Sequence, residues 1–414
     1  MTVRYPGLFT PLDLGRLRVR NRLLQTGHTK HFARDGAETD QDRAYYVVRA
    51  RGGIGMIITG YRFVHPTSSV SNPGYARSYL RSAVAADRRL TDGVHEHGAA
   101  ILVQLNHVGV NGSSEAPNDL RVLWGPSAVR SPVFGEVPKA MDGDDIRELV
   151  SWFGACAELS ADGGFDGVEL HVAHSFLLHQ FLSPLYNKRR DEYGGSLDGR
   201  LRLTTEVIAE VRRRIGPDRV LGVRLPLSDG VPGGLDTDDA VAVARRLEAE
   251  GGIDYVNLSI GGYHDGLSLA IAPSDLPDGW MLRGIATVKA GLRRLPAFAV
   301  GGIKDAAHAE QVLVDGIADM VAITRADIAD PDFPNKVRDG REDEVYHCIR
   351  CNQGCISRPQ RGLPIACTVN PTVGREDSTR LEPAPVARSW LVVGGGPAGM
   401  KAAEILARRG HRVT

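Results

Sequence analysis

Eight short apolar runs, rich in β-branched residues, recur along the chain with amphipathic segments between them. The amphipathic segments include residues 238–250 and 306–316. This alternation at this count predicts a parallel sheet closed into a (β/α)8 TIM barrel, with a doubly wound open sheet as the alternative. The predicted strands are residues 23–25, 54–59, 100–105, 167–170, 221–224, 255–258, 297–300 and 320–323.

Polar residues follow several of these runs, at the end of a barrel where loops carry the chemistry. Gly301 and Gly302 follow the seventh run, and Thr324 and Arg325 follow the eighth. Barrels commonly bind phosphate at these two positions, because glycine lets backbone N–H groups approach the oxygens and arginine supplies a forked cation. The polar residues at the strand ends are Gln104, His171, His174, Arg224, His264 and Arg325.

Two histidines, His171 and His174, come directly after the fourth run. Paired imidazoles at this position can hold a substrate oxygen or an anion by hydrogen bonds. They can also bind a metal or serve as ordinary structural groups, although the metal interpretation lacks the carboxylate of a typical zinc motif.

Four of the five cysteines lie within 20 residues, as Cys348-x2-Cys351-x3-Cys355-x11-Cys367. Three closely spaced thiolates can wrap one inorganic core, and a fourth can close it from beyond a short loop. The spacing favours an iron–sulfur cluster over zinc, because the run is tighter than the paired Cys-x2-Cys knuckles of most zinc sites.

A glycine pattern, Gly394-x-Gly396-x-x-Gly399, lies between an apolar strand at 390–393 and a helix at 400–409. It is typical of a dinucleotide-binding turn, in which a pyrophosphate lies at the helix N-terminus. The acidic residue that usually binds the ribose, about 20 residues further on, would lie beyond Thr414. We therefore expect the given sequence to end inside a domain.

The charge balance argues against nucleic acids and anionic membranes as partners, because Lys+Arg and Asp+Glu both number 50. No run of 18 apolar residues and no signal-peptide core is present. The clustered thiols fit ligands in a reducing cytoplasm better than a disulfide framework.

The segment HVAHSFLLHQFLSPLYNKRRDEYGGSLDGR at 171–200 resembles the signature of the old yellow enzyme family of FMN barrels, as do LFTPL at 8–12 and RNR at 20–22. This resemblance covers residues 6–340. The cysteines and the glycine turn are similar to the multidomain branch that includes 2,4-dienoyl-CoA reductase and trimethylamine dehydrogenase.

The resemblance implies four parts and three bound groups. The barrel would bind FMN, the cysteine segment a [4Fe–4S] cluster on all four cysteines, and a truncated Rossmann-like domain FAD or ADP. The implied parts are the barrel at 1–340, the cysteine segment at 341–375, a linker at 376–388 and the start of the Rossmann-like domain at 389–414.

Site roles follow by matching position. His171 and His174 would bind the substrate oxygen, and Arg224 would lie near flavin N1. The phosphate would lie against Gly301, Gly302, Thr324 and Arg325. The other implied flavin contacts are Thr26, Gly27, His28, Gly60 and Gln104.

One departure concerns proton donation. Family reductases usually have Gly-Tyr after the second histidine, and that Tyr is their proton donor, but here the pair is Ser175-Phe176. Since phenylalanine has no proton to give, His264, Tyr263 or Tyr61 could serve instead. Tyr61 also resembles the aromatic position that boxes an alkylammonium in trimethylamine dehydrogenase.

The favoured hypothesis is an oxidoreductase that passes electrons from NAD(P)H through FAD, the cluster and FMN to an activated C=C bond. The alternative is an amine dehydrogenase or demethylase that passes electrons outward to an external carrier. A non-catalytic electron-transfer subunit is a third hypothesis. We expect small-molecule substrates and NAD(P)H or an external carrier as partners, with a homo-oligomer left open.

Overall fold

The computed structural model describes residues 4–68, 70, 72, 74–116, 119–132, 134–263, 267–379 and 381–414. They form two compact units, Met1–Gly374 and Arg375–Thr414, and each is described here by itself. All eight predicted strands are present in the first unit. They are β3 (Leu23–Gln25), β4 (Met56–Ile58), β6 (Ala100–Asn106), β11 (Gly167–His171), β12 (Val220–Pro226), β13 (Tyr255–Ser259), β14 (Ala297–Ala299) and β15 (Met320–Ala322).

These strands form one closed parallel barrel. They pair in the order β3, β4, β6, β11, β12, β13, β14 and β15, and β15 pairs back to β3 through Val321 and Leu23. Their residues are buried on both faces, which explains why the strands read as continuous apolar runs. The (β/α)8 barrel prediction is confirmed, and the open-sheet alternative is wrong.

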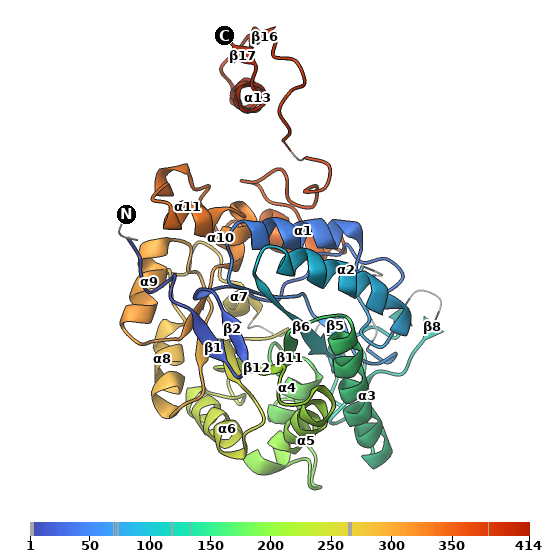
Figure 1. The fold of residues 1–414 in the computed structure, drawn as a ribbon. Helices are drawn as coiled ribbons and strands as arrows, with labels where there is room; N and C mark the ends of the chain where they lie inside the picture. Colours follow the sequence, from blue (N-terminus) through green and yellow to red (C-terminus); the bar gives the residue numbers. More distant parts are fainter. Residues whose placement is uncertain are drawn as a thin grey trace. The chain divides into compact units, whose positions relative to one another are not determined.

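Helices surround the barrel in chain order (Figure 1). Several begin with a capping box, as α3 does at Asp142 and α6 at Asp236, where the cap side chain accepts a backbone N–H of the first turn. The helices of this unit are α1 (Asp40–Arg51), α2 (Val84–His95), α3 (Gly143–Asp162), α4 (Leu177–Leu182), α5 (Leu197–Ile215), α6 (Thr237–Glu250), α7 (Leu267–Ala270), α8 (Leu282–Gly291), α9 (Ala306–Val314), α10 (Thr324–Ala329), α11 (Phe333–Arg338) and α12 (Arg358–Gln360).

Several very short strands lie outside the barrel ring. The sequence did not predict them, because two or three residues carry no readable periodicity. They are β1 (Leu12–Leu14), β2 (Leu17–Val19), β5 (Arg62–Phe63), β7 (Glu115–Ala116), β8 (Asp119–Leu120), β9 (Trp124–Gly125) and β10 (Lys139–Ala140).

The second unit is a single parallel βαβ element. Its strands β16 (Ser389–Trp390) and β17 (Arg412–Val413) pair in parallel on either side of α13 (Pro397–Arg408). The first strand begins one residue before the predicted 390–393 and shares only Trp390 with it, because the residues that pair with β17 are Ser389 and Trp390. The helix begins at Pro397 rather than at residue 400, and proline is preorganised for a first helical turn.

No helix in the described part of the chain combines the length and the apolar character needed to cross a bilayer.

Candidate active site

A large cavity opens at the carboxyl ends of the barrel strands. It holds about 1400 Å³ of space free of protein atoms, counting its open mouth. Gly60 lies beside it, in a smaller pocket that shares His28 and Tyr61. His264 lies outside the described residues. The predicted site residues that line the cavity are Thr26, Gly27, His28, Tyr61, Gln104, His171, His174, Arg224, Gly301, Gly302, Thr324 and Arg325.

Two glycines near the first two strand ends lie where a side chain has no room. A Cβ at Gly27 would lie 2.7 Å from the Thr59 carbonyl oxygen, and one at Gly60 would lie 2.4 Å from that of His28. Both contacts are with backbone atoms, which cannot rotate away. Glycine at these two positions is therefore required for the close packing of the first two strand ends.

A buried polar network forms the floor of the cavity around Arg224. Its Nη1 donates to the Thr26 hydroxyl and its Nη2 to the Ser259 hydroxyl at 3.0 Å. Gln104 donates to Glu169 at 2.7 Å, and burial raises the pKa of Glu169 although Arg224 acts against it. The Arg224 Nε has no hydrogen-bond partner among the described residues and is buried. A buried cation with an unused N–H fits an anionic or electron-rich ring edge, so these residues fit FMN.

The two histidines lie together against this floor. His171 Nε2 and His174 Nδ1 are 3.3 Å apart, and their rings are nearly perpendicular, at 81°. Burial lowers the pKa of both imidazoles well below 6.5, and the Arg224 charge acts in the same direction. Both rings are therefore neutral at physiological pH, and each carries one N–H.

A backbone turn of uncommon conformation holds His174 in the cavity. His174 and Ser175 both have left-handed φ angles, 58° and 59°. The Ser175 amide donates to His179 Nδ1 at 2.7 Å, and its carbonyl accepts from Asn111 at 2.7 Å and from Gln180 at 2.6 Å. These three buried contacts offset the cost of two successive left-handed residues.

Aromatic side chains form the wall that faces the histidines. The Phe176 ring lies 4.7 Å from that of His171, 5.0 Å from Tyr61 and 5.4 Å from Tyr263, between ring centroids. Tyr75 stacks on Tyr61 at 5.1 Å. Burial raises the pKa of Tyr61 and Tyr263, and their hydroxyls share a hydrogen bond. The phenols therefore keep their protons at neutral pH.

The predicted phosphate end holds more cations than the sequence indicated. Arg350, from the cysteine segment, lines the cavity beside Gly302, and Lys304 lines it as well. Both pair with Asp278, Lys304 at 3.0 Å. Arg325 donates through Nη1 to Asn352 at 2.7 Å, so its side chain is directed partly toward the cysteine segment. The one sequence signal for these extra cations was the position of Arg350 between two of the clustered cysteines.

All four clustered cysteines line one second, smaller cavity, whose wall includes Arg325 and Arg350. Between the second and third cysteines, a Cβ at Gly354 would lie 2.4 Å from the Ala366 carbonyl oxygen. This glycine therefore lets the chain that carries Cys367 approach the tight run. Burial raises the pKa of Cys355 to about 12, so a cationic core would be needed to ionise that thiol.

Among the described residues, no three His, Cys, Asp or Glu side chains are close enough together to hold a metal ion. The four thiols therefore share one cavity without forming a metal-ligand group among the described residues, and the choice between an iron–sulfur cluster and zinc stays a prediction.

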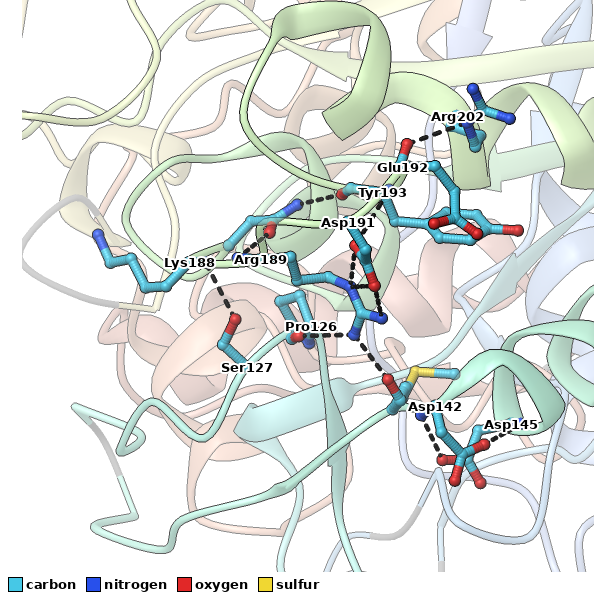
Figure 2. A network of polar contacts seen from close by, with 12 residues as sticks. Pro126, Ser127, Asp142, Asp145, Lys188, Arg189, Asp191, Glu192, Tyr193 and Arg202 are labelled. Carbon is cyan, nitrogen blue, oxygen red and sulfur yellow. Dashed lines mark hydrogen bonds and ion pairs between the residues drawn. The ribbon is translucent and has the colours of Figure 1, made fainter.

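Most of the 187–200 part of the signature segment is structural. Figure 2 shows Arg189 reaching from this loop to the chain before α3, where it donates to the carbonyls of Pro126 at 3.0 Å and Met141 at 2.6 Å. It also pairs with Asp191, and Lys188 donates its amide to the Ser127 hydroxyl at 3.0 Å (Figure 2). This part of the motif therefore braces the barrel, and the motif residues that line the cavity are His171, His174 and Phe176.

Several known proteins are similar to this chain in sequence or in fold. The chain is 35% identical over 412 residues to NADH oxidase of Thermoanaerobacter brockii. This match covers 99% of the chain and 63% of the relative. It is 34% identical over 423 residues to N,N-dimethylglycine/sarcosine dehydrogenase of Chromohalobacter salexigens. This match covers 99% of the chain and 60% of that relative. The solved complex of 2-naphthoyl-CoA reductase with 2-naphthoyl-CoA superposes on the chain with a TM-score of 0.91 at 28% sequence identity. The superposition covers 98% of the chain and 64% of the reductase.

The chain thus spans about three fifths of the length of these relatives. The model of the NADH:flavin oxidoreductase / NADH oxidase family matches residues 7–344, which confirms the resemblance of the barrel. These relatives are named as an oxidase, a dehydrogenase and a reductase. The chain is a member of the NADH:flavin oxidoreductase / NADH oxidase family.

Proposed function

We propose that this protein reduces a C=C bond conjugated to a carbonyl or thioester, with electrons from NAD(P)H. The proposal assigns FMN to the barrel cavity, a [4Fe–4S] cluster to the four clustered cysteines, and FAD or ADP to the glycine turn of the second unit. When bound, these groups supply the electron path from NAD(P)H and the hydride that adds to the substrate.

The charge of the main cavity carries this proposal. Its described lining includes four cationic side chains, Lys304, Arg224, Arg325 and Arg350, and no carboxylate. Such a lining suits a phosphorylated cofactor and a substrate that carries oxygen. It opposes a substrate that must enter as an ammonium ion.

The histidine pair would bind the substrate oxygen. A neutral imidazole donates one N–H, and two such donors from His171 and His174 would stabilise the negative charge that develops on that oxygen as the C=C bond is reduced. Because burial keeps both rings neutral, the pair supplies hydrogen bonds without adding positive charge to the cavity.

The second hydrogen must arrive as a proton, and Tyr61 is the donor we propose. Phe176 occupies the position of the usual tyrosine, and the Tyr61 ring lies beside it at 5.0 Å. The Tyr61 hydroxyl is hydrogen-bonded to Tyr75 and Tyr263, so a neighbouring phenol can return the proton. Hydride plus this proton balances the two-electron reduction of the double bond.

Two observations at the glycine turn of the second unit support a bound dinucleotide there. Gly394 has a φ of 108°, and a Cβ at Gly399 would lie 2.0 Å from the Gly394 carbonyl oxygen. The third glycine of the pattern is therefore required for the helix to pack on the turn.

The test is an anaerobic titration of the flavin-loaded, full-length protein with NADPH and NADH, followed by absorbance. We expect rapid bleaching of both flavins and reoxidation by conjugated thioesters, with enoyl thioesters and the aromatic 2-naphthoyl-CoA as the acceptors to test. In Tyr61→Phe, flavin reduction by NAD(P)H should persist while reoxidation by the thioester slows at least tenfold. No bleaching by NAD(P)H in protein that dithionite reduces would contradict the proposal.

One observation favours a second function, oxidation of an N-methylated amine. Tyr61, Tyr75, Phe176 and Tyr263 enclose one side of the cavity, and stacked aromatic rings can bind an alkylammonium by cation–π attraction. Bleaching of the flavin by N,N-dimethylglycine, without a response to NAD(P)H, would support this function instead.

A further inference from the structure

A cluster of buried charged side chains lies beside the aromatic wall of the main cavity. Lys30 Nζ lies 3.2 Å from Asp42 Oδ1 and 3.9 Å from Glu38 Oε2. Arg62 Nη1 lies 2.8 Å from Asp87 Oδ1, and its Nη2 lies 3.3 Å from Glu38 Oε1. None of these five side chains is more than 6% exposed. Glu38 therefore lies between the two cations and joins them into one network.

The charges of this cluster do not balance while every group is ionised. Two cations face three carboxyls, so one excess negative charge would be buried, which is costly. Arg62 donates to Asp87 at 2.8 Å, and Lys30 donates to the Tyr46 hydroxyl at 2.7 Å. Glu38 Oε2 is buried and accepts no hydrogen bond from the described residues. Glu38 is therefore the carboxyl with the weakest support for a negative charge.

The proton that balances the cluster belongs to Glu38. The carboxyls of Glu38 and Asp42 share a hydrogen bond, and two carboxylates have no proton to share. Burial and the Asp42 charge raise the pKa of Glu38 to about 8, although Lys30 and Arg62 act against them. Burial alone would also raise the pKa of Asp42, but Lys30 and the Thr39 amide help to lower it. At neutral pH the cluster is balanced, with Glu38 as the neutral acid.

The small pocket beside this cluster reaches the phenols of the main cavity. Glu38, Tyr61 and Tyr75 all line it. Its volume, as the space open to the centre of a water molecule, is about 20 Å³. About 10–15 Å³ is enough for one water. His31 lines the same pocket, and its buried Nδ1 has no partner among the described residues, which indicates a water. Since Tyr61 and Tyr75 share a hydrogen bond, one water would join the acid to both phenols.

We propose that Glu38 stores the proton that returns to Tyr61 after each reduction. This inference rests on the proposed function, in which Tyr61 gives its proton to the substrate carbon. Tyr75 passes its proton to the Tyr61 phenolate, and Glu38 passes its proton through the pocket to Tyr75. Glu38 is left as a carboxylate, and the excess negative charge then draws a proton from solvent to restore the acid. Glu38 contacts no substrate, so it acts through Tyr61 as a positioning residue for the proton.

The first experiment reads the proton on Glu38 by infrared spectroscopy of the flavin-loaded, full-length protein. A protonated carboxylic acid has a carbonyl band that a carboxylate lacks, and ¹³C-labelled glutamate separates Glu38 from buried aspartates. We expect a band at neutral pH that is lost in Glu38→Gln and disappears from the parent as the pH rises through about 8. Because glutamine replaces a neutral acid, Glu38→Gln should keep the parent's urea midpoint at pH 7. An unchanged band in Glu38→Gln, or a large fall of its midpoint, would overturn the inference.

The second experiment compares one turnover with many, in stopped-flow reduction of an enoyl thioester. A single turnover uses the proton already on Tyr61, so its rate should be equal in the parent and Glu38→Gln. Later turnovers need that proton replaced, and in Glu38→Gln they should slow at least about tenfold. The parent's multiple-turnover rate should fall as the pH rises through about 8, because the acid form of Glu38 is required. Glu38→Gln should show no such fall.

The matched control is Asp327→Asn. Asp327 is also fully buried, and burial raises its pKa to about 7, but it lines neither the main cavity nor the small pocket. This variant should keep the parent's single- and multiple-turnover rates. Binding of 4-chlorophenolate, followed by the flavin absorbance band, should be equal in the parent and both variants if the main cavity is intact.

The two experiments separate this inference from the proposed function. A protonated Glu38 in protein that reduces no conjugated thioester would contradict the proposed function and support the stored proton. Thioester reduction with equal multiple-turnover rates in the parent, Glu38→Gln and Asp327→Asn would support the proposed function and overturn the role of Glu38.

Discussion

The buried carboxylate of Asp229 offers the sharpest test of how the site is held. It lies in the loop after β12, with Oδ1 2.8 Å from His179 Nε2. Its Oδ2 accepts from the Ser183 hydroxyl and from the Leu235 amide, both at 2.7 Å. His179 in turn accepts the Ser175 amide. Asp229 therefore fixes the histidine that fixes the left-handed turn beneath the substrate-binding pair.

The size of the effect follows from the pKa of Asp229. Burial alone would raise it, but His179, Ser183 and the Leu235 amide outweigh burial and lower the pKa from 3.8 to about 2. That difference is worth about 2.4 kcal/mol of stability at neutral pH. Because the pKa is lowered in the folded state, this contribution is complete above about pH 4 and is lost as the pH falls through about 2.

We expect Asp229→Asn to lower the free energy of unfolding by about 2 kcal/mol at pH 7, measured by reversible urea denaturation. Binding of 4-chlorophenolate should also weaken about tenfold, since the turn costs on the order of 1–3 kcal/mol per strained residue and loses one of its anchors.

The matched control is Asp254→Asn. Asp254 accepts the Leu221 amide at 2.8 Å and pairs with Arg212 at 2.7 Å, at the opposite end of the barrel strands. This variant should lose stability but keep its affinity for the phenolate. Equal phenolate affinity in Asp229→Asn and Asp254→Asn would refute the argument that Asp229 positions the turn.

Two further predictions concern the other bound groups. Cys355→Ser should lose most of its iron and acid-labile sulfide, because a cluster ligand is missing. The control Cys156→Ser should keep both, because the Cys156 thiol is buried against the Val64 carbonyl. Undiminished iron in Cys355→Ser would exclude Cys355 as a ligand. In the full-length protein, Gly399→Ala should retain less FAD than Gly395→Ala. A Cβ at Gly399 clashes with the Gly394 carbonyl, whereas a Cβ at Gly395 meets nothing within 4 Å. Equal FAD contents in the two variants would exclude this turn as the binding site.

The barrel could be predicted from sequence because its signal is local. Strands buried on both faces must be apolar along their whole length, so each one stands out from the amphipathic helices between them. The predicted and observed strands agree to within a few residues. The two-residue strands β5, β9 and β10 could not be predicted, because they form only where distant segments meet.

The position of the candidate site could be predicted from the sequence, but the hydrogen bonds and contacts within it could not. Residues at the ends of parallel strands must lie at one end of a barrel, so Gln104, Arg224 and the histidines were expected to lie near one another. The contacts of Arg350 and Ser259 depend on which loops fold over the strand ends. A serine at a strand end has no sequence signal that separates a hydrogen-bond partner of a buried histidine from an ordinary buried hydroxyl.

The backbone supplies an independent argument about where function lies. Six non-glycine residues of the described chain have left-handed φ angles, and three of them, His174, Arg350 and Asn352, line the two cavities. Each left-handed non-glycine residue costs on the order of 1–3 kcal/mol of folding free energy. Folding alone gives no reason to concentrate that cost at one end of a barrel. In both places the turn directs a polar side chain inward, His174 in the main cavity and Arg350 at the wall that the two cavities share. The strain therefore falls where a substrate and an electron carrier would have to lie close together.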